Sequence, residues 1–203
     1  MRGKRIAVVG AGNVLMGDEG VGVEVMRALE NTVRGAGSGS SDPAGTVRVA
    51  APSGAAGAAD SVDFIDAGTG FFTMVSDLDG YEAVVIIDAA SGNGEPGAMY
   101  RFEVGDDGGG TSGGGVPGET AAKGSGLPGL LELRRAAPIS LHDFGVLESI
   151  AWERVRGKLR GKVVLFGIEP WNVELRLGLS EPLEAKLDRY VERILREIEA
   201  MLK

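Results

Sequence analysis

The sequence contains no cysteine. Disulfide bonds, thiolate zinc sites and cysteine nucleophiles are therefore excluded, and a bound metal would need oxygen or imidazole ligands. Imidazole is scarce as well, because His142 is the single histidine among 203 residues. The lack of cysteine fits a reducing compartment, so we expect a cytoplasmic protein.

Long apolar runs and an excess of basic residues are also missing. No stretch approaches the ~18 consecutive apolar residues of a membrane span, so we expect no membrane insertion. Lysine and arginine total 21 against 29 acidic residues, a net charge of −8, whereas nucleic-acid-binding proteins concentrate positive charge on one face. We therefore expect no nucleic-acid partner. We also expect the protein to act as a monomer.

Apolar segments that alternate with helical patterns predict a single α/β domain over residues 1–203. The segment 4–10 contains a continuous apolar run, which is typical of a buried parallel strand. We expect a mostly parallel, twisted sheet of five or more strands with helices on both faces. Further strands are predicted at 62–68, 83–90, 98–104 and 162–169 and after residue 45, and helices at 18–34, 70–79, 142–156 and after 180.

The final helix has the clearest pattern. Ser180 is the predicted N-cap, and acids and a proline follow it in the first turn. Its apolar stripe is predicted to pack against the core rather than bind a partner. The stripe consists of Leu183, Leu187, Val191, Ile194, Ile198 and Met201.

Glycine-rich segments interrupt the pattern near residues 34–60 and 105–129. Eight glycines lie between positions 105 and 118. Such a composition buries too little apolar surface to offset the entropy cost of ordering the chain. We expect both segments to be flexible insertions within the domain.

The first predicted strand leads into the turn GNVLMGDEGVG, residues 12–22. A dinucleotide-binding turn needs a third glycine where this chain has Leu15, and Asp18 and Glu19 would repel a pyrophosphate at the helix start. There is also no G-K-[ST], so a P-loop is excluded. Considered alone, this turn fits a structural explanation as well as a functional one. In the structural explanation, Asp18 is the N-cap of the helix and Glu19 is an acid favoured in its first turn.

Two other residues change that balance. Asp88 closes the apolar run AVVII, at the carboxyl end of a predicted central strand, where open α/β sheets bind ligands. His142 stands where the second insertion gives way to a helix. A strand-end residue and a lone histidine each have ordinary structural explanations. Together with Glu19, they would form an O, O, N site suited to nickel, zinc or another divalent ion, with open coordination positions.

The motifs GNVLMGDEGVG, DAGTG, VVIIDAA, SLHDFG and GIEP, in this order, resemble those of the nickel-iron hydrogenase maturation endopeptidases. The similarity spans about residues 4–202 apart from the insertions, and the first motif is the most specific. In that family the second acid of the turn, the aspartate that closes the apolar strand and the histidine after the long loop bind the metal. By motif match these are Glu19, Asp88 and His142.

The resemblance implies an enzyme that recognises nickel in the precursor of a hydrogenase large subunit and removes its C-terminal extension. The three metal ligands would also be the catalytic residues. Nickel would be supplied by the substrate, and another divalent ion is an alternative. In the family's D-G-G-T-x-G loop this chain has Asp66 to Phe71 with two glycines replaced, so we expect substrate fit to differ there. The residues assigned to substrate contact are Gly12, Asn13, Asp18, Gly68 and Thr69.

Two alternatives remain open. A nucleotide-binding Rossmann-like enzyme is supported only by the partial glycine turn. A non-catalytic nickel-sensing maturation factor would hold the metal with the same triad and cleave nothing. Within the site, Asn13 is predicted to hydrogen-bond the turn backbone or a peptide, Asp18 to organise the turn and Thr69 to lie near the cleft.

Overall fold

The computed structural model describes residues 3–36, 46–49, 60–92, 94–104 and 145–203. Most of both glycine-rich segments lies outside these ranges, so their predicted flexibility stays a prediction. His142 and the first residues of the helix predicted at 142–156 also lie outside the described ranges.

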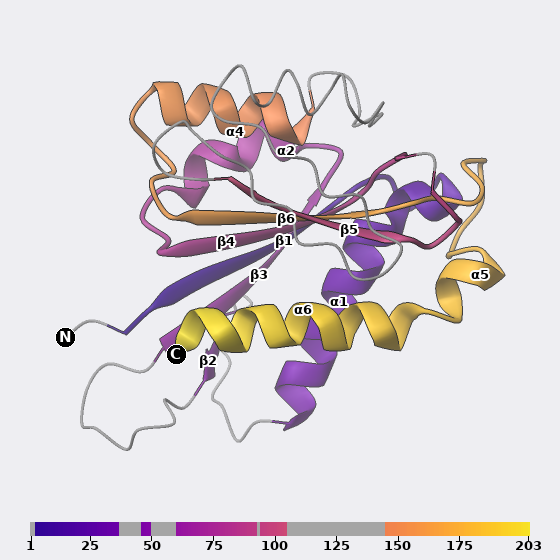
Figure 1. The fold of residues 1–203 in the computed structure, drawn as a ribbon, viewed down its shortest axis with the longest axis horizontal. Helices are drawn as coiled ribbons and strands as arrows, with labels where there is room; N and C mark the ends of the chain where they lie inside the picture. Colours follow the sequence, from indigo (N-terminus) through magenta and orange to yellow (C-terminus); the bar gives the residue numbers. More distant parts are fainter. Residues whose placement is uncertain (1–2, 37–45, 50–59, 93, 105–144) are drawn as a thin grey trace.

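A six-stranded sheet forms the centre of the described structure, in the order β2-β3-β1-β4-β6-β5 (Figure 1). The four middle strands are parallel, and the two edge strands β2 and β5 are antiparallel to their neighbours. This confirms the predicted mostly parallel sheet and the extra strand after residue 45. The strands are β1 (Arg5–Ala11), β2 (Thr46–Val49), β3 (Asp60–Gly68), β4 (Ala83–Ala89), β5 (Met99–Val104) and β6 (Lys162–Ile168).

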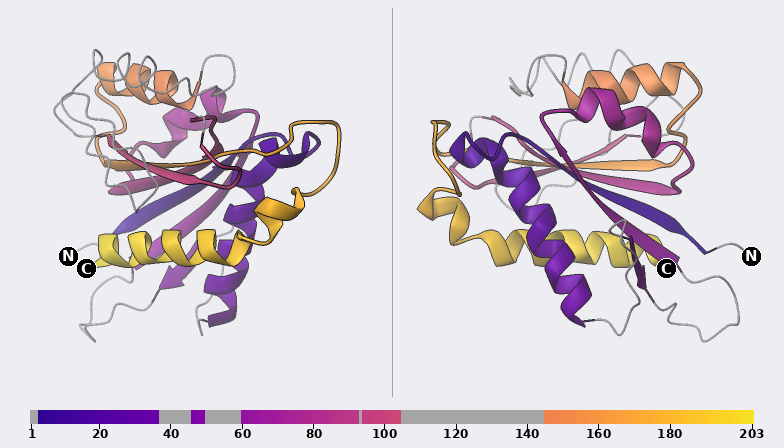
Figure 2. Two further views of the ribbon diagram at one scale, coloured as in Figure 1. Left: turned by 45° about the vertical axis from the view of Figure 1, so that its right-hand side comes forward. Right: turned by 180° about the vertical axis from the view of Figure 1, so that it is seen from behind.

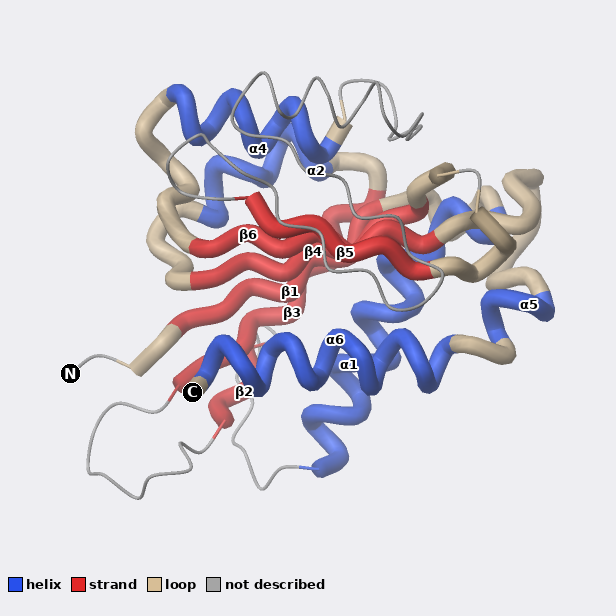
Figure 3. Tube along the Cα trace, in the orientation of Figure 1, coloured by secondary structure: helices blue, strands red, loops and turns tan. Residues whose placement is uncertain are grey.

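Helices cover both faces of the sheet, as Figures 2 and 3 show. On one face α1 (Val21–Ala36) and α6 (Leu187–Leu202) pack with Ile6 and Val8 of β1. On the other face α2 (Phe71–Met74), the 3-10 helix η2 (Val75–Leu78) and α4 (Val146–Val155) pack with Ala7 and Val9. Successive residues of β1 therefore enter opposite cores, which is why the strand is a continuous apolar run.

The helix starts differ in detail from the sequence prediction. The helix expected from residue 18 begins as the 3-10 turn η1 (Gly17–Gly20) and becomes α-helical only at Val21. The final helix is divided into α5 (Glu181–Glu184) and α6. Its apolar stripe lies in or against the core, as predicted.

Ser180 holds the N-cap position of α5, but its side chain does not cap the helix. The predicted N-cap residue is thus confirmed without a side-chain capping bond, and the Ser180 hydroxyl donates to the Asp18 carboxylate at 2.7 Å. A hydrogen bond to an ionised carboxylate is stronger than one to a neutral group, so this bond ties the start of α5 to the glycine turn.

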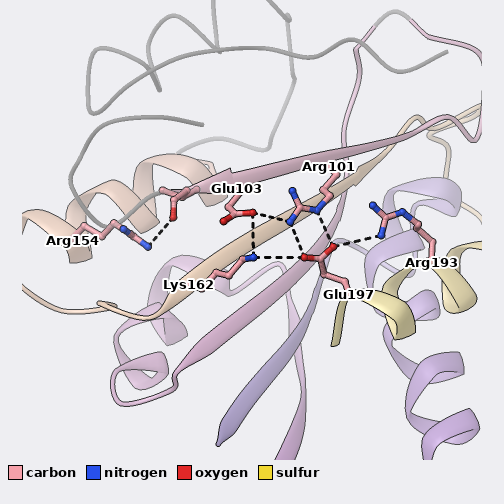
Figure 4. A network of polar contacts seen from close by, with 7 residues as sticks. Arg101, Glu103, Arg154, Lys162, Arg193 and Glu197 are labelled. Atoms are coloured by element: carbon pink, nitrogen blue, oxygen red, sulfur yellow. Dashed lines mark hydrogen bonds and ion pairs between the residues drawn. The ribbon is translucent and has the colours of Figure 1, made fainter. Parts of the chain in front are cut away.

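A network of charged side chains fixes α6 to the edge of the sheet (Figure 4). Arg101 on β5 donates to both carboxylate oxygens of Glu197 on α6, at 2.9 and 2.7 Å. Glu103, Lys162 and Arg193 extend the network. The hydrogen bonds from Arg101 hold the pKa of Glu197 below its usual range despite partial burial. No helix within the described ranges is long and apolar enough to cross a membrane.

Candidate active site

The candidate site lies at the edge where the four parallel strands end. There β1 leads into the glycine turn, β3 into Gly68 and Thr69, β4 ends at Asp88 and Ala89, and β6 leads to Glu169. The Gly12 N–H donates to the Gly68 carbonyl at 2.8 Å, so the first two loops are directly joined. Ligands of open α/β sheets bind at this edge.

Two glycines of the turn allow an unusually close approach of backbone to backbone. Gly12 has a φ of +124°, and a Cβ there would overlap the Glu19 carbonyl. A Cβ on Gly22 would overlap the carbonyl oxygens of Ala11 and Ile87. The start of α1 therefore lies directly on β1 and β4. Gly12 thus serves packing against η1 and Gly22 serves packing against the strands, so Gly12 of the partial nucleotide fingerprint has a structural explanation.

This packing brings Glu19 and Asp88 into one buried environment. Glu19 is 7% exposed and Asp88 is 3% exposed. Burial, with a smaller contribution from the negative charge of Glu19, raises the pKa of Asp88 to about 7, although a hydrogen bond from the Ala89 N–H acts in the opposite direction. The two acids thus interact electrostatically although 69 positions separate Glu19 from Asp88 in the sequence.

The two acids are two of the three predicted metal ligands. Neighbouring buried carboxylates repel each other, and a divalent cation between them would relieve that repulsion. In the part of the chain that is described, no three metal-ligating side chains cluster closely enough to hold an ion. The predicted third ligand, His142, lies outside that part. The ligand roles of all three residues therefore stay predictions.

Asp18 is fully buried and joins the glycine turn to the segment after β6. Its carboxylate accepts hydrogen bonds from the backbone N–H groups of Trp171, Asn172 and Ser180, at 2.9, 3.0 and 2.6 Å, and from the Ser180 hydroxyl. Burial opposes ionisation, but these hydrogen bonds outweigh it and hold the pKa of Asp18 below its usual value. The geometry favours the predicted turn-organising role over a direct contact with substrate.

We expect Asp18→Asn to destabilise the fold by about 2–4 kcal/mol at neutral pH, because an amide turns a donor toward partners that are themselves donors. Urea unfolding followed by circular dichroism measures the loss. The lowered pKa means that wild-type stability is lost as pH falls through that pKa, and the variant should lack this part of the acid dependence. The exposed Asp77→Asn is the control and should change stability by less than about 0.5 kcal/mol; equal losses in both variants would contradict the assigned role.

The other residues assigned to substrate contact lie around the same loops. Asn13 accepts a hydrogen bond from the Leu15 N–H at 3.1 Å, as expected for a residue that supports the turn backbone. Gly68 has a φ of +49°, and its N–H donates to the Asp66 carboxylate. Thr69 is exposed. Contact of these residues with a substrate stays a prediction.

Glu169 was given no role from the sequence, although it lies within the GIEP motif. One of its carboxylate oxygens accepts hydrogen bonds from the N–H groups of Gly92 and Gly94 and from the Tyr100 hydroxyl, at 2.6, 3.2 and 2.7 Å. Glu169 thereby fixes the loop that follows Asp88. Its position in the sequence could have indicated a role, because Glu169 follows an apolar run just as Asp88 does.

Comparison with known proteins points to one group. A family model described as hydrogenase maturation protease matches residues 49–107. The hydrogenase 2 maturation protease of Escherichia coli is 25% identical over 192 residues, which is 94% of this chain and 88% of the relative. The coenzyme F420 hydrogenase subunit delta of Methanothermobacter thermautotrophicus is 28% identical over 198 residues, covering 95% of this chain and 94% of the relative.

A solved structure supports the same conclusion. The crystal structure of a hydrogenase 2 maturation peptidase from a Thaumarchaeota archaeon superposes with a TM-score of 0.57 at 26% identity, over 97% of this chain and 99% of that one. The similarity thus covers the sheet, the helices and the candidate site. Motif order, sequence similarity and fold agree, and they confirm that this chain is a relative of the hydrogenase maturation proteases and, like them, a hydrolase.

Proposed function

We propose that the protein is an endopeptidase that recognises nickel in the precursor of a nickel-iron hydrogenase large subunit and removes the C-terminal extension. The observation that carries the proposal is the buried pair of Glu19 and Asp88 at the carboxyl edge of the sheet. In this proposal nickel arrives with the substrate, and the enzyme acts as a cytoplasmic monomer.

The acid pair suits a metal that is shared with a substrate. Two carboxylates, with His142 as third ligand, leave coordination positions open. A divalent ion held there would supply Lewis acidity toward the scissile carbonyl or toward water. Ligation and base catalysis use the same lone pairs, so we assign ligation to Glu19 and Asp88 first. Without cysteine, the chain lacks the thiolates needed to remove nickel from a sulfur-rich site.

The test compares two samples of one precursor, loaded with nickel or metal-free, in buffer stripped of free metal. We expect the nickel-loaded precursor to lose its extension at least about tenfold faster, because the ion completes the site. Intact mass before and after incubation measures the cleavage. Equal rates for the two samples would refute nickel recognition and leave an endopeptidase of another kind.

A second function has one observation in its favour. The relative from Methanothermobacter thermautotrophicus is named as a hydrogenase subunit rather than as a protease. A non-catalytic maturation factor would bind the nickel-loaded precursor and leave its mass unchanged. The same incubation therefore separates the two functions when the bound fraction is measured alongside the mass.

A further inference from the structure

Large apolar side chains are exposed on the loop between β6 and α5 and on the glycine turn beside it. On the loop they occupy every second position, with Trp171, Leu175 and Leu177 exposed by 62%, 84% and 75%. Val173 of the same loop and Leu15 of the glycine turn are also about half exposed. We call these five residues the loop surface. Exposed apolar side chains gathered in this way usually mark an interaction site.

The loop is held in place by the glycine turn and lies beside the start of α1 (Figure 2). The Arg176 N–H donates to the Leu15 carbonyl and the Gly17 N–H to the Arg176 carbonyl, both at 2.9 Å. The Asp18 carboxylate binds the other end of the loop through Trp171 and Asn172. A fixed loop presents its apolar side chains with little further entropy to lose on binding.

Asp18 and η1 link the loop surface to the candidate site. Asp18, which holds the loop, directly precedes Glu19, and η1 packs against β4, the strand that ends in Asp88. A peptide bond positioned at the acid pair would therefore have neighbouring residues within reach of the loop.

We propose that the loop surface docks an uncharged, apolar segment of the protein substrate, close to the bond that is cleaved. The assignment rests on the proposed endopeptidase function. The five contributing side chains are apolar, so the matching segment is apolar too. A second copy of the chain is a poorer match, because a stable protein–protein interface buries about 1,200–2,000 Å² and a single loop with one adjoining residue offers much less. A substrate segment needs only a few such contacts and has to leave after cleavage.

The test is the double variant Leu175→Ser/Leu177→Ser, assayed with the full-length nickel-loaded precursor. Both side chains are exposed, so the fold should be retained, and an unchanged melting temperature verifies this. We expect KM to rise at least about tenfold while kcat stays within about twofold, the pattern of lost ground-state binding. The matched control is Val155→Ser, an apolar residue of α4 that is 68% exposed and should leave both constants unchanged. Added salt should leave wild-type KM nearly constant, because the contact is apolar.

Other outcomes separate the docking surface from the proposed function. If the wild type cleaves the precursor and the double variant has the same KM, the docking surface is wrong and the proposed function is retained. A wild type that neither binds nor cleaves the precursor overturns both. A dimeric wild type and a monomeric double variant in light scattering assign the surface to a second copy and overturn the substrate assignment. A fall in kcat with constant KM also overturns it, since the loop would then act in the chemistry.

Discussion

Asp88→Asn is expected to reduce precursor cleavage at least about 100-fold while leaving the fold as stable as the wild type or more so. Asparagine has nearly the same shape, and its side-chain oxygen can still accept the Ala89 N–H. It cannot carry the negative charge that would hold a cation beside Glu19. Activity and stability should therefore change in opposite directions, which a residue needed only for folding would not produce.

The pH dependence of stability provides an independent measurement. The pKa of Asp88 is about 7 in the folded protein because of burial and of Glu19, against 3.8 for a free side chain. Between these values the folded state keeps a proton that the unfolded chain releases, so wild-type stability falls as pH rises through this window. By proton linkage the difference corresponds to roughly 4 kcal/mol above the window, and Asp88→Asn should recover part of it.

Urea unfolding at several pH values and cleavage assays on the same preparations test both parts. The exposed acid Glu95 lies in the loop after β4, and Glu95→Gln is the control that should keep wild-type activity. If Asp88→Asn cleaves the precursor nearly as fast as the wild type, the carboxylate is only a strand-end residue and the proposed site is wrong.

Gly22→Ala is expected to destabilise the protein by at least about 3 kcal/mol, which lowers the melting temperature by roughly 10 °C in a chain of this size. The added methyl group would overlap carbonyl oxygens of β1 and β4, which belong to the centre of the sheet and cannot move away. Helix propensity alone predicts the opposite, because alanine is about 1 kcal/mol better than glycine within a helix. Calorimetry of thermal unfolding shows directly whether Gly22→Ala lowers or raises the stability of the protein.

Gly35→Ala is the matched control in the same helix. A Cβ at position 35 meets nothing within 4 Å. We expect this variant to be neutral or slightly stabilised, by at most about 1 kcal/mol. A stable Gly22→Ala variant would show that α1 can shift away from the strands, and the close approach would then not be what positions Glu19 beside Asp88.

The parallel core of the fold could be predicted because three of its four strands contain a continuous apolar run. Strands β1, β4 and β6 are buried on both faces, so composition alone marks them. The antiparallel direction of β5 could not be predicted. Its burial alternates because it lies at the sheet edge, and an alternating strand fits either direction.

The site could be predicted only where the residue type itself suggested chemistry. Glu19 and Asp88 were found because acids are unusual at a glycine turn and after an apolar strand. The partners of Asp18 and Glu169 could not be found, because they are mostly backbone N–H groups, which every sequence position offers. The loop surface was also missed. Apolar residues usually indicate a core, and only the structure shows that Leu175 and Leu177 face outward.

Asp18 receives its hydrogen bonds from residues that follow it by 153 to 162 positions. On the ribosome the glycine turn is therefore made well before these partners. Contacts of such long sequence separation form late in folding, and domains fold as units. Until then the turn that carries Glu19 lacks its anchor, and a truncated chain that ends before residue 171 never gains it. Translation through residue 180 is thus a condition for an anchored acid pair, so products that end before this position are expected to be inactive as well as unstable.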